Sequence, residues 1–379
     1  MSFSRTLAVL VSVSALLAGC AHHAARPPGP STPAGKPAAA PAPPACGDVT
    51  TLPVRDKLAQ LLMVGVKNAD DARSVVDGYH VGGIFIGSWT DLSIFKGPLA
   101  EIAAKAGPLP LAVSVDEEGG RVSRLRSLIG EAPSPRQLAQ TQTVAQVHDL
   151  AAERGKKMRE LGITIDFAPV VDVTDATSGV IGDRSFGGDP NTVIAYAGAY
   201  AQGLRDAGLL PVLKHFPGHG HGSGDSHTGG VVTPPLSDLQ NLDLVPYRTL
   251  ITVAPVAVML GHLQVPGLTG DDPASLSHAA VQLLRDGVGY GAPPFNGPVF
   301  TDDLSSMGAI SDRYGVAEAV LRTLQAGTDV ALWVTTDEVP AVLDRLQKAV
   351  AAGELPSQRV DDALTRVATM KGRSPACGH

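Results

Sequence analysis

The chain has 379 residues, of which 44% are hydrophobic and 18% are charged, and its formal net charge at pH 7 is −7. This length and apolar content exclude a wholly disordered chain and allow one large core, such as that of an α/β barrel. The acidic balance, without a large basic patch, argues against a nucleic-acid partner.

The first predicted element, over residues 1–19, is a secretory signal. Arg5 is followed by the apolar segment TLAVLVSVSALLAGC, which ends in small residues and is too short for a good membrane span. The residues LAGC, from Leu17 to Cys20, resemble the lipobox of bacterial lipoproteins. The resemblance implies cleavage before Cys20, attachment of a lipid there, and an exported protein held at the cell membrane by one anchor. An ordinary signal peptide with a coincidental cysteine is the alternative.

Residues 20–45 form the next segment, which is rich in proline and alanine and shows no periodicity. A segment of this composition buries little apolar surface and is typical of an extended, disordered tether. We expect the folded domain to occupy residues 46–379, with its last element ending near Lys371.

Short apolar runs alternate with helical patterns throughout this domain. Such runs are typical of parallel strands covered by helices. The repeated unit predicts the α/β class and a single (β/α)8 TIM-type barrel. An open doubly wound sheet is the alternative, although no glycine-rich phosphate-binding fingerprint follows the first run. The predicted strands are residues 61–66, 82–87, 111–116, 164–173, 211–216, 256–262, 298–303 and 329–334.

Polar residues cluster at the ends of several predicted strands. In a parallel barrel these carboxyl ends face the same way, and active sites lie there. One aspartate after a strand is often only a helix cap, but the repetition favours a shared pocket. Adjacent strand residues point to opposite faces, so only one of Asp302 and Asp303 is expected to enter it, and alternation does not tell which. The cluster comprises Asp116, Lys214, His215, His262, Asp302 and Asp303.

Two further segments carry groups suited to holding a sugar. VDEEGGRVSRL, from Val115 to Leu125, combines carboxylates, a glycine pair for a sharp turn and two arginines. A carboxylate accepts hydrogen bonds from sugar hydroxyls and an arginine donates to others. The alternative is a capped turn with solvated charges. GDRSFG, from Gly182 to Gly187, adds Arg184 on a glycine-bounded loop.

The segment KHFPGHGHGSGDSHTGG, Lys214 to Gly230, combines many glycines with several histidines. Ordering glycine and burying ionisable groups are both costly, so this composition predicts a mobile, functional loop rather than core. A zinc site is one alternative, although Lys214 beside His215 would repel a cation. Its candidate ligands are His219, His221, Asp225 and His227.

Together these motifs resemble glycoside hydrolase family 3, and within it the β-N-acetylglucosaminidase branch of bacterial cell-wall recycling hexosaminidases. KHFPGHGHGSGDSH is similar to the pattern K-H-F-P-G-H-G-x4-D-S-H of that branch, and VDEEGGRVSRL to D-x-E-G-G-R-V-x-R. TDDLSSMGA looks like S-D-D-L-x-M-x-G-A, with Thr301 in place of the usual serine and a departure around Ser306. The resemblance extends from about Asp56 to Lys371.

The resemblance implies roles for individual residues. The first aspartate of the DD pair, Asp302, corresponds to the nucleophile. His227, oriented by Asp225, corresponds to the general acid/base on the mobile loop. The positions that correspond to the N-acetylglucosamine site are Asp116, Arg124, Arg184, Lys214 and His215.

The function implied is that of a retaining exo-β-N-acetylglucosaminidase that acts on peptidoglycan-derived or other β-GlcNAc-terminated saccharides. We expect no cofactor, no metal and a monomer. Two alternatives stay open: a phosphorylase, in which inorganic phosphate replaces water at the same site, and a non-catalytic sugar-binding lipoprotein. The leaving group is not fixed by the sequence.

The cysteines give the last prediction. If Cys20 carries the lipid, Cys46 and Cys377 remain, one on each side of the domain. Disulfides persist in exported proteins, and the first and last elements of a closed barrel are neighbours. We therefore predict a Cys46–Cys377 disulfide, with two free thiols as the alternative.

Overall fold

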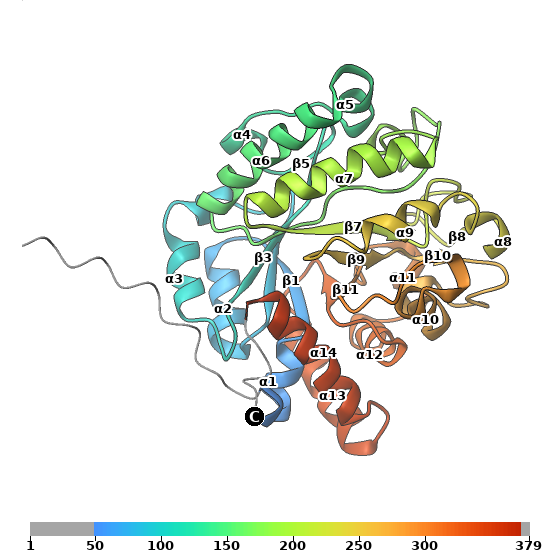
Figure 1. The fold of residues 1–379 in the computed structure, drawn as a ribbon. Coiled ribbons are helices and arrows are strands. Elements are labelled where there is room, and N and C mark those ends of the chain that lie inside the picture. The colour runs from blue at the N-terminus through green and yellow to red at the C-terminus, as the bar shows by residue number, and fades with distance from the viewer. Residues whose placement is uncertain (1–48, 373–379) are drawn as a thin grey trace, which may run out of the picture. The chain divides into compact units, whose positions relative to one another are not determined.

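The computed structural model describes residues 49–372, which contain all eight predicted strands (Figure 1). The predicted signal peptide and tether lie outside these residues. So do Cys20, Cys46 and Cys377.

The core of the fold is a parallel eight-stranded sheet with the strand order β11-β9-β7-β6-β3-β2-β1-β12. A parallel bridge between Phe300 and Val330 joins the two outer strands of this order, and the Thr301 amide donates to the Val330 carbonyl over 3.1 Å. The sheet therefore closes, and the barrel prediction is confirmed. The strands are β1 (Leu62–Val66), β2 (Gly83–Ile86), β3 (Ala112–Val115), β6 (Ile165–Asp166), β7 (Leu210–Phe216), β9 (Ala257–Leu260), β11 (Val299–Thr301) and β12 (Ala331–Trp333).

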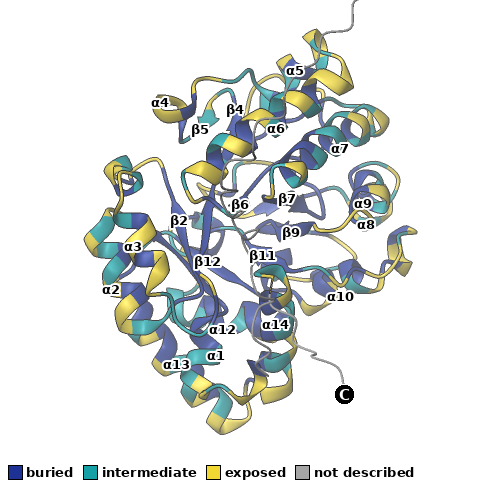
Figure 2. Cartoon of the chain, turned by 60° about the vertical axis from the view of Figure 1, so that its left-hand side comes forward, coloured by how far each residue is buried: buried dark blue, intermediate teal, exposed yellow. Residues whose placement is uncertain are grey.

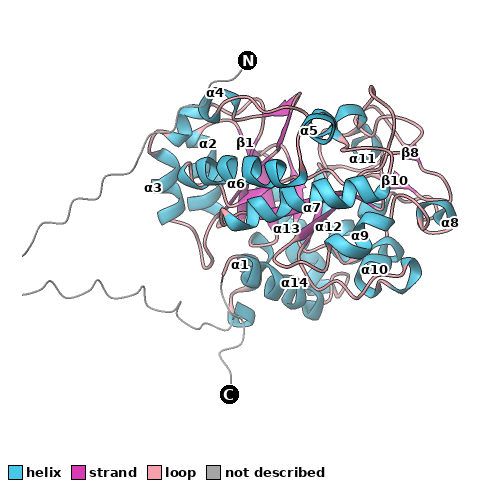
Figure 3. Cartoon of the chain, turned by 45° about the horizontal axis from the view of Figure 1, so that its top comes forward, coloured by secondary structure: helices cyan, strands magenta, loops and turns pink. Residues whose placement is uncertain are grey.

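Helices surround this sheet, with their buried faces toward the strands and their exposed faces outward (Figures 2 and 3). No helix within residues 49–372 has both the length and the hydrophobicity needed to span a membrane. The α-helices are α1 (Val54–Ala59), α2 (Ala69–Tyr79), α3 (Pro98–Ala104), α4 (Arg126–Ile129), α5 (Pro135–Thr141), α6 (Val144–Glu160), α7 (Pro190–Asp206), α8 (Leu236–Leu239), α9 (Val245–Leu250), α10 (His278–Asp286), α11 (Gly308–Ser311), α12 (Val316–Ala326), α13 (Val339–Ala352) and α14 (Ser357–Met370).

The fourth strand is much shorter than predicted. The apolar run suggested a strand over residues 164–173, but regular pairing stops at Asp166, and beyond it a single bridge joins Val170 to Lys214. Pro169 has no amide hydrogen and cannot donate to a strand ladder. The rest of the run is a buried loop that carries Asp172 beneath the carboxyl ends of the strands.

Aromatic side chains fill the barrel interior below those ends. The ring of Phe167 lies 5.8 Å from that of Phe85 and 5.6 Å from that of Phe300, measured between centroids. All three are buried. Because Phe300 lies two residues before Asp302, this apolar layer fixes the strand end that presents the aspartate.

Two small sheets elaborate the carboxyl face. The hairpin of β4 (Glu117–Gly119) and β5 (Val122–Ser123) follows β3, and the parallel pair of β8 (Val231–Val232) and β10 (Leu263–Gln264) follows β7 and β9. At the hairpin turn, Gly119 and Gly120 have φ of 92° and 55°. A Cβ on Gly119 would lie 2.4 Å from the Pro133 carbonyl oxygen, so the predicted glycine turn is a steric requirement.

Candidate active site

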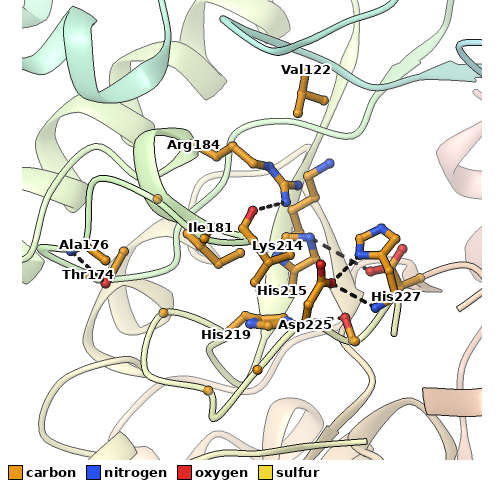
Figure 4. A pocket seen from close by; sticks show the side chains of 18 of the residues that line it. Val122, Thr174, Ala176, Ile181, Arg184, Lys214, His215, His219, Asp225 and His227 are labelled. Carbon is orange, nitrogen blue, oxygen red and sulfur yellow. Dashed lines mark hydrogen bonds and ion pairs between the residues drawn. The ribbon is translucent and has the colours of Figure 1, made fainter. Parts of the chain in front are cut away.

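A pocket of about 690 Å³ opens at the carboxyl ends of the strands (Figure 4). It brings together residues from β5, β7 and the loops that follow β3, β5, β6, β7 and β11. Every described residue to which the family resemblance assigned a site role lies on its wall, whereas His262 and Asp303 of the strand-end cluster do not. The residues on the wall with an assigned role are Asp116, Arg124, Arg184, Lys214, His215, Asp225, His227 and Asp302.

A buried carboxylate, Glu118, holds the two cations of the predicted sugar site. Its two oxygens accept from Nε and one terminal nitrogen of Arg184, each over 2.8 Å. The ammonium of Lys214 lies 2.6 Å from Oε1 of Glu118 and 2.7 Å from Oδ1 of Asp116. Glu118 is therefore a positioning group that the sequence analysis did not single out.

The charges of this cluster support one another. Burial alone would raise the pKa of Glu118, but Arg184 and Lys214 outweigh it and hold that pKa far below its usual value. Burial would likewise lower the pKa of Lys214, but Asp116 and Glu118 outweigh it and raise that pKa. The lysine is thus a fixed ammonium whose remaining donor capacity faces the pocket.

A second buried carboxylate, Asp172, organises the floor of the pocket. Its Oδ2 lies 2.7 Å from Nδ1 of His215, and its Oδ1 accepts from the backbone amide of His219 over 2.7 Å. Despite burial, the charge of His215 and these bonds lower its pKa. Asp172 closes the long apolar run that was predicted as a strand, and a polar residue at the end of that run was the available signal.

Asp302 is the member of the aspartate pair that enters the pocket. Its Oδ1 accepts from the Asp303 amide over 2.9 Å, and its Oδ2 lies 4.0 Å from Nε2 of His215. Asp303 turns away and caps the following loop, where it accepts from the amides of Ser305 and Ser306 over 2.8 and 3.0 Å. The structure thus resolves the choice that strand alternation left open.

The Asp302 carboxyl is held in its ionised form. Burial would raise its pKa, but the positive potential of His215 and His262 and the Asp303 amide lower it to about 2. A carboxylate with this pKa is unprotonated at neutral pH and is available as a nucleophile. His262 itself is buried between Ser275 and the Asp303 carbonyl, 2.7 and 2.8 Å away, and supports the strand end from behind.

Asp225 and His227 form a paired dyad on the loop after β7 (Figure 4). Nδ1 of His227 lies 2.7 Å from Oδ1 of Asp225, which also accepts from the His227 amide over 3.0 Å. Burial would raise the pKa of Asp225, but these two hydrogen bonds lower it. With Nδ1 held by a carboxylate, Nε2 of His227 is the nitrogen free to exchange a proton with a bound molecule.

The four residues considered as zinc ligands are engaged in three different pairings and do not converge on one point. His227 pairs with Asp225, Nε2 of His219 lies 3.2 Å from the Ser226 hydroxyl, and Nδ1 of His221 lies 3.0 Å from Oδ1 of Asp243. Across residues 49–372, no group of three or more His, Cys, Asp or Glu side chains is placed to hold a metal ion.

The two arginines of the hairpin motif, Arg121 and Arg124, differ in their hydrogen bonding. Arg121 donates from Nε to Asp183 over 2.9 Å and from a terminal nitrogen to the carbonyls of residues 179–181, so it ties down the loop that carries Arg184. Arg124 lines the pocket, and its buried Nε has no hydrogen-bond partner among residues 49–372. An unpaired buried donor at a pocket wall is ready to bind a ligand acceptor.

Chemically, the pocket combines an ionised carboxylate, a histidine paired with a carboxylate, and a ring of fixed donors and acceptors. The first can attack an electrophilic carbon and the second can give or take a proton. The polar ring suits a ligand rich in hydroxyl groups.

The chain is similar to known proteins in both sequence and structure. The model of the glycosyl hydrolase family 3 N-terminal domain matches residues 53–370. The chain is 70% identical to a protein of Mycobacterium tuberculosis named Beta-hexosaminidase LpqI, and the match covers 100% of both chains. The solved structure of M. tuberculosis LpqI, with 74% identity, aligns with a TM-score of 0.86 over 88% of this chain and 99% of that one. A family 3 β-N-acetylglucosaminidase of Paenibacillus sp., 33% identical, aligns with a TM-score of 0.79 over 86% of this chain and 64% of that one.

Proposed function

Because the chain belongs to glycosyl hydrolase family 3, we propose that it is a β-hexosaminidase that acts as a retaining exo-β-N-acetylglucosaminidase. The observation that best supports this proposal is that Asp302 and the Asp225–His227 dyad line one pocket. The names of the M. tuberculosis and Paenibacillus proteins support the same activity and the same sugar.

In the first step, a carboxylate oxygen of Asp302 attacks the anomeric carbon of a terminal β-GlcNAc residue. The bond from that carbon to the leaving-group oxygen breaks, and protonated Nε2 of His227 gives its proton to that oxygen. The product is a glycosyl ester of Asp302. The positive potential that lowers the pKa of Asp302 to about 2 keeps the attacking oxygen ionised.

In the second step, a water molecule attacks the anomeric carbon from the side the leaving group has vacated. Nε2 of His227 takes the proton of the water, and the Asp302 carboxylate departs. The two displacements together retain the β configuration. Asp225 keeps the imidazole in the tautomer that both steps need and stabilises its charged form.

The sugar ring is held by the polar wall. Asp116 is 21% exposed at its side chain and accepts from two adjacent hydroxyls, while Lys214 and Arg184, fixed by Glu118, donate to the ring substituents. Arg124 supplies the unpaired donor, and His215 lies between the sugar and Asp172.

We also propose that the protein is exported, carries a lipid at Cys20 and acts as a monomer. An enzyme held outside the membrane meets fragments of peptidoglycan, so GlcNAc linked β-1,4 to a muramic acid derivative is the proposed natural substrate. The anchor keeps the enzyme at the surface without any membrane span in the catalytic domain.

A phosphorylase is the second candidate, and a specific observation favours it. The acid/base is a histidine instead of a second carboxylate, so less negative charge opposes the entry of inorganic phosphate. The cationic wall of Arg124, Arg184 and Lys214 would attract that anion.

One experiment separates these functions. A β-GlcNAc disaccharide is incubated with and without inorganic phosphate, and the first product is followed by proton NMR. The proposal expects β-GlcNAc as the first product under both conditions. GlcNAc 1-phosphate would establish the phosphorylase, α-GlcNAc would exclude retention, and binding without turnover would favour a sugar-binding protein. Activity that persists in a strong chelator would exclude a catalytic zinc.

A further inference from the structure

Ser226 lies between Asp225 and His227 in the sequence, but it is buried whereas they are exposed. The side chains of Asp225 and His227 are 43% and 59% exposed, but Ser226 is only 2% exposed. A buried polar residue between two exposed ones, on a loop rich in glycine, marks the point at which the loop touches the barrel.

Ser226 is held from two sides. On the inner side its hydroxyl lies 3.2 Å from Nε2 of His219, a buried imidazole whose pKa burial lowers. On the outer side its carbonyl accepts from the Ala309 amide over 3.2 Å, and the carbonyl of His227 accepts from the Gly308 amide over 3.1 Å. The dyad is thus bonded to the start of α11.

The approach of α11 depends on Gly308. A Cβ on this residue would lie 3.0 Å from both the Gly229 amide nitrogen and the Thr228 carbonyl carbon, and 3.3 Å from the His227 carbonyl oxygen. These are backbone atoms, so a side chain at position 308 requires the dyad loop to shift by a few tenths of an ångström. Gly308 begins α11, directly after the loop that starts at Asp302, so the contact with the dyad is made close in sequence to the nucleophile.

The contact of Ser226 with His219 also leads toward Asp302. Oδ1 of Asp172 accepts from the His219 amide over 2.7 Å, and its Oδ2 lies 2.7 Å from Nδ1 of His215, whose Nε2 faces Asp302. Both contacts of Ser226 therefore end at groups that position the nucleophile.

We propose that Ser226 and Gly308 are positioning residues that hold the His227 imidazole at the distance from Asp302 that proton transfer to the leaving group requires. The inference rests on the proposed function, because it assigns the anchor to the acid/base named there. The anchor fixes the middle of the loop, while the glycines on either side of it leave the exposed dyad free to settle onto a bound sugar.

The test compares kcat/KM for two β-GlcNAc glycosides, one with an activated aryl leaving group and one with an alkyl leaving group. For a retaining enzyme, kcat/KM reports the first displacement. In that step only the alkyl leaving group needs a proton from the general acid. The variants are Ser226→Ala and Gly308→Ala. The control is Gly315→Ala, because a Cβ at Gly315 meets nothing within 4 Å and φ there is −70°. His227→Ala is the reference for complete loss of the acid.

We expect the alkyl substrate to lose roughly 10- to 100-fold in both variants and the aryl substrate less than about threefold, because a small misplacement of a catalytic group has effects of this size. Gly315→Ala is expected to behave as the unmodified enzyme. In a His227→Ala background, neither change should cause a further selective loss, because the misplaced group is already gone.

The outcomes separate the two proposals. If His227→Ala itself affects both substrates equally, the assigned acid is wrong and the proposed function needs another proton donor. If His227→Ala is selective but Ser226→Ala and Gly308→Ala are not, the anchor is wrong. Melting temperatures identify variants that fail to fold. Ser226→Ala removes a single oxygen, and its selectivity decides the matter if Gly308→Ala unfolds.

Discussion

Two adjacent aspartates with opposite orientations carry the first prediction. Asp302→Ala should reduce kcat/KM on an aryl β-GlcNAc glycoside by more than about 10³-fold, because the first displacement has no other nucleophile even when the leaving group is activated. The fold should persist, since the Asp302 side chain is 22% exposed and, within the described part of the chain, accepts a single hydrogen bond, from the Asp303 amide. Steady-state kinetics and circular dichroism check both parts.

Asp303→Ala is the matched comparison. Its carboxylate accepts from the amides of Ser305 and Ser306, so its removal should lower thermal stability and leave measurable turnover. Near-normal kinetics in Asp302→Ala, with loss of chemistry in Asp303→Ala, would reverse the assignment of the pair.

Glu118 gives a prediction about a group that touches no substrate. Glu118→Gln removes the carboxylate that pairs with both buried cations, and within residues 49–372 Lys214 then keeps its ion pair with Asp116 while Arg184 loses the one it has. Removing one member of a buried charge cluster typically costs about 3–5 kcal/mol. We expect a lower denaturation midpoint and a raised KM, both measurable in parallel. A variant with unchanged stability and KM would show that Asp116 alone holds the lysine.

At the scale of elements, the loop from Lys214 to Gly230 is bound to the segment between α8 and α9 by the pair of His221 and Asp243, 3.0 Å apart. The hydrogen bond to Asp243 raises the pKa of His221, against a smaller opposing effect of burial, and Asp175 and Asp172 add to the rise. Burial raises the pKa of Asp243. The pair is therefore ionic only in a window below the raised pKa of His221 and above that of Asp243.

The sign of the pH effect follows from these directions. A histidine whose pKa is raised on folding stabilises the folded state fully at pH values below its unfolded-state pKa of about 6.5. This stabilisation is lost as the pH rises through the folded-state pKa. His221→Ala should thus lower the melting temperature by roughly 1–2 °C near pH 6, the scale of a partly exposed ion pair, and by less at pH 9. Scanning calorimetry of both proteins at the two pH values checks this. A difference that grows with pH would contradict it.

The elements also show which structural features can be predicted from sequence patterns. The glycine-rich loop, the glycine turn at Gly119 and the polar strand ends were all predicted, because each is a local pattern with a local physical cause. Asp172 was missed, because its role depends on His215 and the His219 backbone across the barrel. The choice of Asp302 over Asp303 was supplied by the family resemblance, and strand alternation left it open.

Across the whole molecule, the two ends of the barrel have different tasks. The pocket lies at the carboxyl ends of the strands. Just before β12, buried Asp329 pairs with Arg285, Arg359 and Arg366, which ties α10 and α14 to the base of the sheet. These ion pairs connect structural elements, and none of their residues lines the pocket.

The first and last described elements meet at that base. The 3-10 helix η1 (Val49–Thr51) packs against α14. After α14, the Lys371 ammonium donates to the Gly82 carbonyl over 2.6 Å and to Gln60 over 3.0 Å, and burial lowers its pKa to about 7. Cys46 lies only three residues before Val49, and Cys377 only five after Gly372. Only short segments therefore separate the two cysteines from the elements that meet at this base.

This arrangement supports the proposed Cys46–Cys377 disulfide and gives the last prediction. The bond would close a loop around nearly the whole domain, so the chain-entropy model limits its stabilisation to about 5 kcal/mol. Cys46→Ser, Cys377→Ser and the double variant should share one lowered melting temperature, since losing either sulfur loses the whole bond. Their kcat/KM should stay within about twofold of the unmodified value, because the base of a barrel lies away from its catalytic face. Alkylation of the unfolded, non-reduced protein followed by mass spectrometry should find neither cysteine labelled, and labelling of both would refute the bond.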